Sequence, residues 1–142
     1  ESVREAAKFL STTEGKILIT TGSKELKEYT KIGNYQERCF ARVLSTKAAM
    51  EESVRLGFEG KHLIAMQGPF SEEMNLALLH QTRARYFVTK ESGKAGGFEE
   101  KLKAAKKAGA VLIVIGRPQE RGRSVQEVCH FIESNFGKKE QE

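Results

Sequence analysis

The sequence has only two cysteines, no long apolar run and no secretory signal, and each of these absences excludes a class of protein. Cys39 and Cys129 are too few and too far apart for a disulfide framework or a zinc site, so both are predicted to be small buried hydrophobic residues. Such cysteine use predicts a reducing, cytoplasmic environment. No apolar stretch approaches the roughly 18 to 20 residues that span a bilayer, so no membrane partner is expected.

Metal-binding and nucleic-acid-binding functions also find little support. The histidines His62, His80 and His130 lie on different predicted elements, and their spacing matches no metal-ligand pattern, so no metal is predicted. Aromatic residues make up 8% of the chain and do not alternate with basic residues as they do in surfaces that stack bases. We therefore expect no nucleic-acid partner. No Ser–His–Asp or Cys–His arrangement is evident, so the catalytic residues stay unknown.

What the chain does contain is typical of one soluble domain. Its 142 residues can bury a sizeable core, and 39% apolar with 30% charged residues is a globular balance. The net charge of +5 favours anionic partners such as phosphates or polycarboxylates. The sequence starts in an amphipathic stretch without an initiator Met, so we expect a piece of a longer protein. Residues 1–10 would form a leading helix and residues 138–142 a tail.

A unit recurs along the chain: a short apolar run, a turn rich in Gly, Ser and Thr, and an amphipathic helix. Apolar runs without alternation are typical of strands buried on both faces of a parallel sheet. The expected strands are residues 16–21, 39–44, 62–66, 86–89 and 111–115. We therefore predict one α/β domain over residues 1–142, with a doubly wound, mainly parallel five-stranded sheet and helices on both faces, a Rossmann-like arrangement.

Capping residues indicate where the intervening helices begin and end. The helix starts are expected at Ser23, Thr46, Ser71 and Ser124, and Gly96 and Gly97 precede the fourth helix. The first of these helices would run to Tyr29, the third would turn Met74 and Leu79 inward, and the fourth would end at Gly109.

Ligands of open parallel sheets bind beyond the carboxyl ends of the strands, and four of these predicted ends carry cations or hydrogen-bond donors. The first is followed by Thr21, Gly22, Ser23 and Lys24. A helix that begins at Ser23 would direct free backbone N–H groups at an anion. The alternative is an ordinary turn from strand to helix.

The third strand is followed by Gln67, Gly68, Pro69, Phe70 and Ser71. Pro69 fixes its own backbone angle and makes the exit from the sheet rigid. Phe70 could then stack on a flat ligand, or it could pack inward as a helix staple.

Residues 89–97, after the fourth strand, are the most informative segment. Lys90, Ser92 and Gly93 stand among further glycines ahead of a helix, which suits a phosphate or carboxylate cradle. A flexible linker is the alternative. Arg117 follows the fifth strand and offers a planar fork to a carboxylate or a phosphate.

Three of these segments resemble the precorrin-6A reductase (cobalt-precorrin-6A reductase) family: KILITTGSKEL at 16–26, IAMQGPFS at 64–71 and TKESGKAGGFEEK at 89–101. Arg117 and Pro118 also fit, and the similarity extends over nearly the whole chain. The resemblance implies a two-domain enzyme that reduces a macrocyclic double bond of precorrin-6A, with or without cobalt, using NADPH or NADH. This chain would be the C-terminal half, joined through residues 1–10 to a missing N-terminal domain and inactive alone.

The resemblance also implies roles for single residues. The expected cofactor contacts are Thr21, Gly22, Ser23 and Lys24, and the expected substrate contacts are Gln67, Phe70, Ser71, Lys90, Ser92, Gly93 and Arg117. A flat polycarboxylated tetrapyrrole matches such a rim of cations and one stacking ring. A non-catalytic anion- or nucleotide-binding α/β module remains the alternative, as does an enzyme that acts on a smaller anion.

Overall fold

The computed structural model of the chain describes residues 2–90 and 97–116. From the amino terminus, the elements are α1 (Ser2–Leu10), β1 (Lys16–Ile19), the 3-10 helix η1 (Leu26–Lys31), α2 (Tyr35–Arg38), β2 (Cys39–Val43), α3 (Lys47–Arg55), the 3-10 helix η2 (Gly60–His62), β3 (Leu63–Ala65), α4 (Glu72–Thr82), β4 (Ala84–Lys90), α5 (Phe98–Ala108) and β5 (Val111–Ile115). The helix expected at Ser124, the tail, Cys129 and His130 lie outside the described residues.

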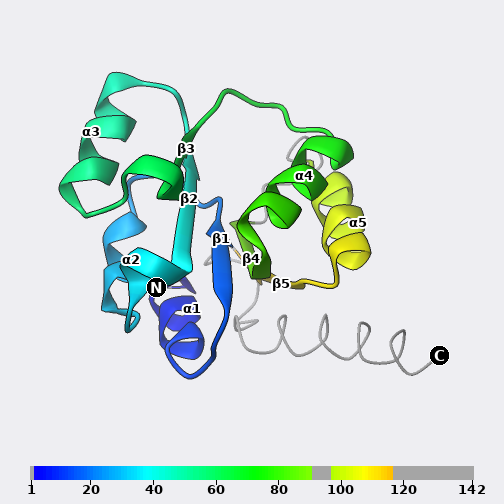
Figure 1. The fold of residues 1–142 in the computed structure, drawn as a ribbon, viewed down its shortest axis with the longest axis horizontal. Helices are drawn as coiled ribbons and strands as arrows, with labels where there is room; N and C mark the ends of the chain where they lie inside the picture. Colours follow the sequence, from blue (N-terminus) through cyan, green and yellow to red (C-terminus); the bar gives the residue numbers. More distant parts are fainter. Residues whose placement is uncertain (1, 91–96, 117–142) are drawn as a thin grey trace.

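The strands form one five-stranded sheet in the order β3-β2-β1-β4-β5, and every pairing is parallel. The chain moves outward from β1 to β3 on one side and then crosses to β4 and β5 on the other (Figure 1). The direction of winding therefore reverses between β1 and β4, at the point where doubly wound sheets place their ligands. The predicted fold class is confirmed.

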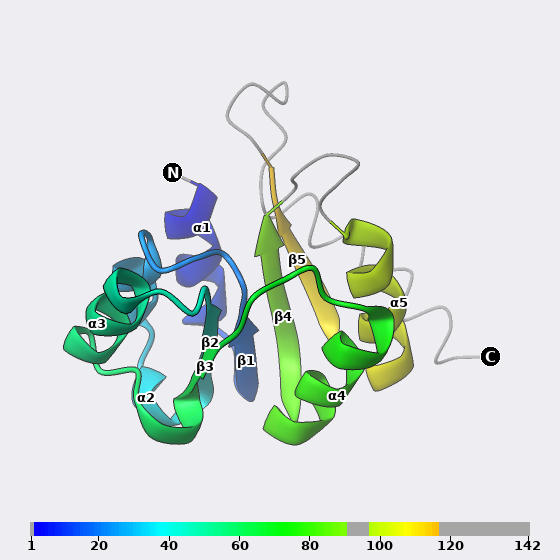
Figure 2. The ribbon, with the colours of Figure 1, turned by 90° about the horizontal axis from the view of Figure 1, so that it is seen from above.

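Helices cover both faces of the sheet, and the side chains of each strand alternate between them. Figures 1 and 2 show α1, α2 and α3 on one side of the strands and α4 and α5 on the other. Ile17 and Ile19 of β1 pack with α1 and η1, whereas Leu18 packs with Leu79 of α4 and Ala105 of α5. We call these two sides the α1/α3 face and the α4/α5 face.

The prediction of a helix that begins at Ser23 is wrong. The segment instead forms the 3-10 helix η1, which is preceded by Glu25, and no side chain caps it. Leu26, Tyr29 and Ile32 recur every third residue and are all buried. This spacing aligns their side chains on a 3-10 helix, which has three residues per turn.

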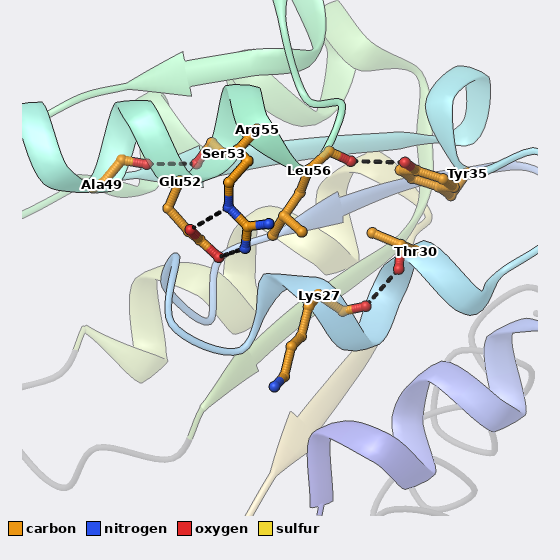
Figure 3. Close-up of polar contacts among 8 residues, drawn as sticks. All are labelled: Lys27, Thr30, Tyr35, Ala49, Glu52, Ser53, Arg55 and Leu56. Atoms are coloured by element: carbon orange, nitrogen blue, oxygen red, sulfur yellow. Dashed lines mark hydrogen bonds and ion pairs between the residues drawn. The ribbon is translucent and has the colours of Figure 1, made fainter.

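The short helix α2, which was not predicted, is joined to the end of α3 by a hydrogen bond (Figure 3). The Tyr35 hydroxyl donates to the Leu56 carbonyl at 2.7 Å, at the end of α3. Within α3, Ser53 Oγ donates to the Ala49 carbonyl, and Arg55 pairs with Glu52 at 2.7 Å. Thr46 caps this helix, as predicted, by accepting a bond from the Ala49 amide.

The helix α4 begins as predicted but buries a different face. Ser71 Oγ accepts a bond from the Met74 amide at 3.1 Å, so Ser71 is the N-cap. The prediction that Met74 faces inward is wrong, because its side chain is 38% exposed. The buried positions are Asn75, Leu79 and Thr82, whose spacing of four and three residues defines one helix face.

The glycines predicted to flank α5 stand at its two ends. Gly97 stands at the start of α5 and Gly109 at its end, and both have a positive φ, 73° and 72°. Within the described residues, no helix is long and apolar enough to cross a lipid bilayer.

Candidate functional site

Three strands bring polar side chains to the α4/α5 face at the carboxyl edge of the sheet. Ile19 of β1 pairs with Ala41 of β2 and with Val88 of β4. One position further along each chain are Thr20, Arg42 and Thr89, which therefore follow one another across the centre of the sheet. Thr20 Oγ1 donates to the Val88 carbonyl at 2.7 Å, which fixes the middle of this row.

Arg42 is a charged residue inside a strand whose five residues are all buried. Its Nη1 donates to Asn75 Oδ1 at 2.7 Å, and its guanidinium lies 3.7 Å from the centre of the Phe70 ring. Asn75 is itself held, since its Nδ2 donates to the Ser71 carbonyl at 2.9 Å. Burial lowers the pKa of Arg42 to about 10, which still leaves the guanidinium charged at neutral pH.

Lys101 of α5 supplies a second cation on the same face. Its Nζ donates to Thr89 Oγ1 at 2.7 Å, and Thr89 is almost completely buried. Burial and, secondarily, the charge of Arg42 lower the pKa of the Lys101 ammonium to about 8. Arg42 and Lys101 thus lie on the same face at the carboxyl edge of the sheet, although they come from a strand and a helix far apart in sequence.

Neither of these two cations pairs with a carboxylate of the described residues. Across residues 2–90 and 97–116, the ion pairs join Lys31 to Glu28, Arg55 to Glu52, Lys90 to Glu25 and Lys107 to Glu72. Arg42 and Lys101 have neutral partners instead, an amide and a hydroxyl. We call Arg42, Lys101, Asn75, Thr89 and Phe70 the cationic cluster.

On the α1/α3 face of the same edge, the loop after β1 contacts the end of β4 and the helix η1. Lys90, the last residue of β4, pairs with Glu25 at 2.5 Å. Thr21 is buried and shares a hydrogen bond of 3.0 Å with the Tyr29 hydroxyl. Burial raises the pKa of Tyr29 well above its ordinary value, so this phenol stays neutral. The loop after β1 and the end of β4 thus lie side by side at the switch point.

The predicted cofactor residues lie in this loop but lack the helix expected behind them. Gly22 has a φ of 95°, and a Cβ added there would meet nothing within 4 Å, so the loop borders open space. Ser23 accepts a bond from the Leu26 amide through its carbonyl, and Lys24 is exposed. Because η1 is a short 3-10 helix, Ser23 does not begin an α-helix that directs backbone N–H groups at an anion.

The predicted substrate residues after β3 border the cationic cluster. Ser71 caps α4, and Gln67 accepts a bond from Ser45 Oγ at 3.2 Å. One face of the Phe70 ring, which was predicted either to stack on a flat ligand or to pack inward, is covered by the Arg42 guanidinium. A Cβ at Gly68 would lie 3.1 Å from this ring, so a glycine allows the ring to approach the loop after β3.

The structure therefore divides the predicted site residues between two faces. Thr21 and Lys90 lie on the α1/α3 face, and Phe70 and Ser71 lie beside α4 on the α4/α5 face. Ser92, Gly93 and Arg117 are outside the described residues.

Sequence reasoning missed Arg42, Asn75, Thr89 and Lys101 as possible site residues. A signal was present for the first, because an arginine stands inside a run predicted to be buried on both faces. Asn75 and Lys101 are ordinary helix residues in the sequence, and only the packing of α4 and α5 brings them to the strand ends.

Two other residue types are inert in the described part of the chain. Cys39 is buried, and burial raises the pKa of its thiol to about 12, so it is a poor nucleophile. His62 Nδ1 donates a hydrogen bond to the Cys39 carbonyl at 2.9 Å, and the ring stacks on Phe40, as a packed histidine does. Within the described residues, no group of three His, Cys, Asp or Glu side chains is placed to hold a metal ion.

Comparison with known proteins gives one family. A family model described as precorrin-6x reductase CbiJ/CobK matches residues 1–133. Cobalt-precorrin-6A reductase of Priestia megaterium is 42% identical over 134 residues, which cover 90% of this chain and 52% of that protein. The enzyme of the same name from Salmonella typhimurium is 37% identical over 117 residues, 82% of this chain and 44% of that protein.

A solved structure has the same fold. The structure of a CobK precorrin-6A reductase matches with a TM-score of 0.55 and 20% identity, and the match covers 92% of this chain and 53% of that one. The chain thus spans about half the length of these relatives. Since the family model matches nearly all of it, the chain belongs to the precorrin-6x reductase CbiJ/CobK family.

Proposed function

We propose that this chain is the C-terminal half of a two-domain enzyme that reduces a macrocyclic double bond of precorrin-6A or cobalt-precorrin-6A, with NADPH or NADH as the reductant, in cobalamin biosynthesis. The observation that carries the proposal is the family match over residues 1–133. The curated relatives are named for the cobalt-containing substrate, so this form is the first to test. A cytoplasmic location is part of the proposal.

The carboxyl edge of the sheet supports the binding part of this proposal. A nicotinamide cofactor supplies a hydride when bound, and its phosphates need cations or amide donors. The loop of Thr21, Gly22, Ser23 and Lys24 offers hydroxyls, backbone N–H groups and one exposed ammonium beside open space. These donors fit a phosphate, although no α-helix begins behind them.

Lys90 is suited to exchange its partner for a substrate carboxylate. Its ion pair with Glu25 is partly exposed: 47% and 38% of the two side chains are accessible, although the paired oxygen of Glu25 is buried. Exposed pairs stabilise a protein by about 1 kcal/mol or less, so an incoming carboxylate could replace Glu25 at little cost. Gln67, Phe70, Ser71, Ser92, Gly93 and Arg117 complete the proposed substrate contacts.

A chimeric enzyme tests the proposal. The C-terminal half of the Priestia megaterium enzyme would be replaced by this chain, and oxidation of NADPH and NADH would be followed with each substrate form. We expect turnover that requires both a cofactor and a tetrapyrrole. A folded chimera, checked by circular dichroism, that binds both ligands without turnover would favour the non-catalytic binding module.

A further inference from the structure

The cationic cluster combines the buried guanidinium of Arg42 with the half-buried ammonium of Lys101, and neither has a carboxylate partner in residues 2–90 and 97–116. This arrangement costs free energy in the ligand-free protein. Buried cations in proteins are normally paired with a carboxylate, because removal from water penalises the charged form. Among the described residues, the polar partner of Arg42 is an amide and that of Lys101 is a hydroxyl, and the charge of Arg42 contributes to the lowered pKa of Lys101. A bound anion would remove both penalties.

We propose that Arg42 and Lys101 form a binding site for one oxyanion group of a ligand, a carboxylate or a phosphate, on the α4/α5 face at the carboxyl edge of the sheet. The inference deepens the proposed function and rests on it for the choice of ligand. A polycarboxylated tetrapyrrole supplies carboxylates, and a nicotinamide cofactor supplies phosphates.

The contacts of Arg42 orient its guanidinium before any ligand arrives. The Phe70 ring fixes the plane of the group, and Asn75 Oδ1 binds one nitrogen. Asn75 is anchored in turn to the Ser71 carbonyl. The other guanidinium nitrogens have no acceptor in the part of the chain that the structure describes, and such a planar fork can bind an oxyanion through two donors.

Lys101 is oriented in the same way by one contact. Its ammonium donates one proton to Thr89 Oγ1, and its two other protons meet no acceptor among the described residues. Thr89 stands one position beyond Val88 in the register that also contains Thr20 and Arg42. The two cations therefore approach the same end of the central strands, β1 and its two neighbours.

A purely structural role explains these contacts less well. An arginine that only supported packing could be replaced by an apolar residue without loss, since buried charges are weak contributors to stability. The positive charge of Arg42 also disfavours the charged form of Lys101. Two cations on one face are expected instead where a ligand supplies a negative charge.

The test compares anion binding by the purified chain and by single variants. Arg42→Gln and Lys101→Met remove one cation each, and Lys103→Met removes an exposed cation from the same helix α5 as the matched control. The probes are uroporphyrin as the polycarboxylate, NADPH, and inorganic phosphate, each titrated calorimetrically. Thermal unfolding of every free variant checks that the fold is retained.

We expect both site variants to weaken binding of at least one probe by about tenfold or more, the effect of one lost charged hydrogen bond. Lys103→Met should bind like the unchanged chain, and Lys101→Arg should retain most of the affinity. Losses confined to uroporphyrin would identify a carboxylate site, and losses confined to NADPH and phosphate a phosphate site. Both results support the inference.

Three results would overturn the inference: no binding of any probe by the unchanged chain, equal affinities in all variants, or an equal loss in Lys103→Met. The chimeric enzyme distinguishes failure of the oxyanion site from failure of the proposed reductase function. If the chimera turns over normally when it carries Arg42→Gln, the oxyanion site is refuted and the reductase stands. If the site binds anions but the chimera is inactive, the reductase proposal fails alone.

Discussion

Lys90 and Lys101 stand at the same edge of the sheet, but their surroundings give them different properties. Lys90 is exposed and paired with Glu25, whereas Lys101 is half-buried, bonded to Thr89 and repelled by Arg42. Loss of Lys90 should therefore affect ligand binding with little effect on stability. Loss of Lys101 should affect both.

The first prediction concerns Lys90 and needs the chimeric enzyme. We expect Lys90→Ala to raise the Michaelis constant for the tetrapyrrole several-fold, because a carboxylate loses its cation. The free energy of unfolding should fall by about 1 kcal/mol or less, as for other exposed ion pairs. Steady-state kinetics and urea unfolding measure the two effects, with Lys103→Ala as control. Unchanged Michaelis constants for both cofactor and substrate would remove Lys90 from the site.

The second prediction follows from the pKa of Lys101. The folded protein holds this proton less tightly than an unfolded chain, since the pKa is lowered from 10.5 to about 8. The unfolded chain therefore binds more protons between these values, and the free energy of unfolding should rise with pH through this window. Allowing for the solvent that reaches Lys101, we expect a contribution of about 1 to 2 kcal/mol.

Urea unfolding at several pH values checks this second prediction against Lys101→Met, which cannot show the Lys101 contribution. Arg42 of β2 is the charged group among the described residues that acts on Lys101, and its own pKa of about 10 adds a rise of the same sign at higher pH. The difference between the two proteins isolates Lys101. A difference that stays constant across the window would contradict the lowered pKa.

Among the elements, those with sequence signals for both ends were predicted well. Thr46 and Ser71 are caps that accept bonds from the expected amides, and Gly109 ends α5 with a positive φ. The 3-10 helix η1 was mistaken for an α-helix, because Ser23 is a good capping residue type. The repeat of Leu26, Tyr29 and Ile32 in steps of three was the better signal.

The third prediction belongs to the helix α4. Ser71→Ala should lower the free energy of unfolding by about 1 kcal/mol, since the Met74 amide loses its acceptor. Ser45→Ala, which removes only an exposed contact with Gln67, serves as the control and should change stability by much less. Urea unfolding of both variants decides the matter, and equal effects would show that the cap contributes nothing.

At the scale of the whole molecule, the sequence predicted the parallel sheet and the polar residues that follow its strands. It did not predict that these residues are divided between the α1/α3 face and the α4/α5 face. Five continuous apolar runs sufficed to predict a parallel sheet, because strands buried on both faces have this pattern. In such a sheet all carboxyl ends meet at one edge. The division into two faces depends on side-chain alternation and on strand register. The contacts of Arg42 with Asn75 and Phe70 depend on how α4 packs, which no local pattern specifies.

We propose that this chain binds anionic ligands along the carboxyl edge of its sheet. The direct test is amide chemical-shift mapping of the purified chain with NADPH and with uroporphyrin. We expect the largest shifts at residues 20–25, 42–43, 66–71 and 89–90, where the strands end. Shifts that gather instead at the opposite edge, around Gly15, Gly57 and Arg83, would contradict it.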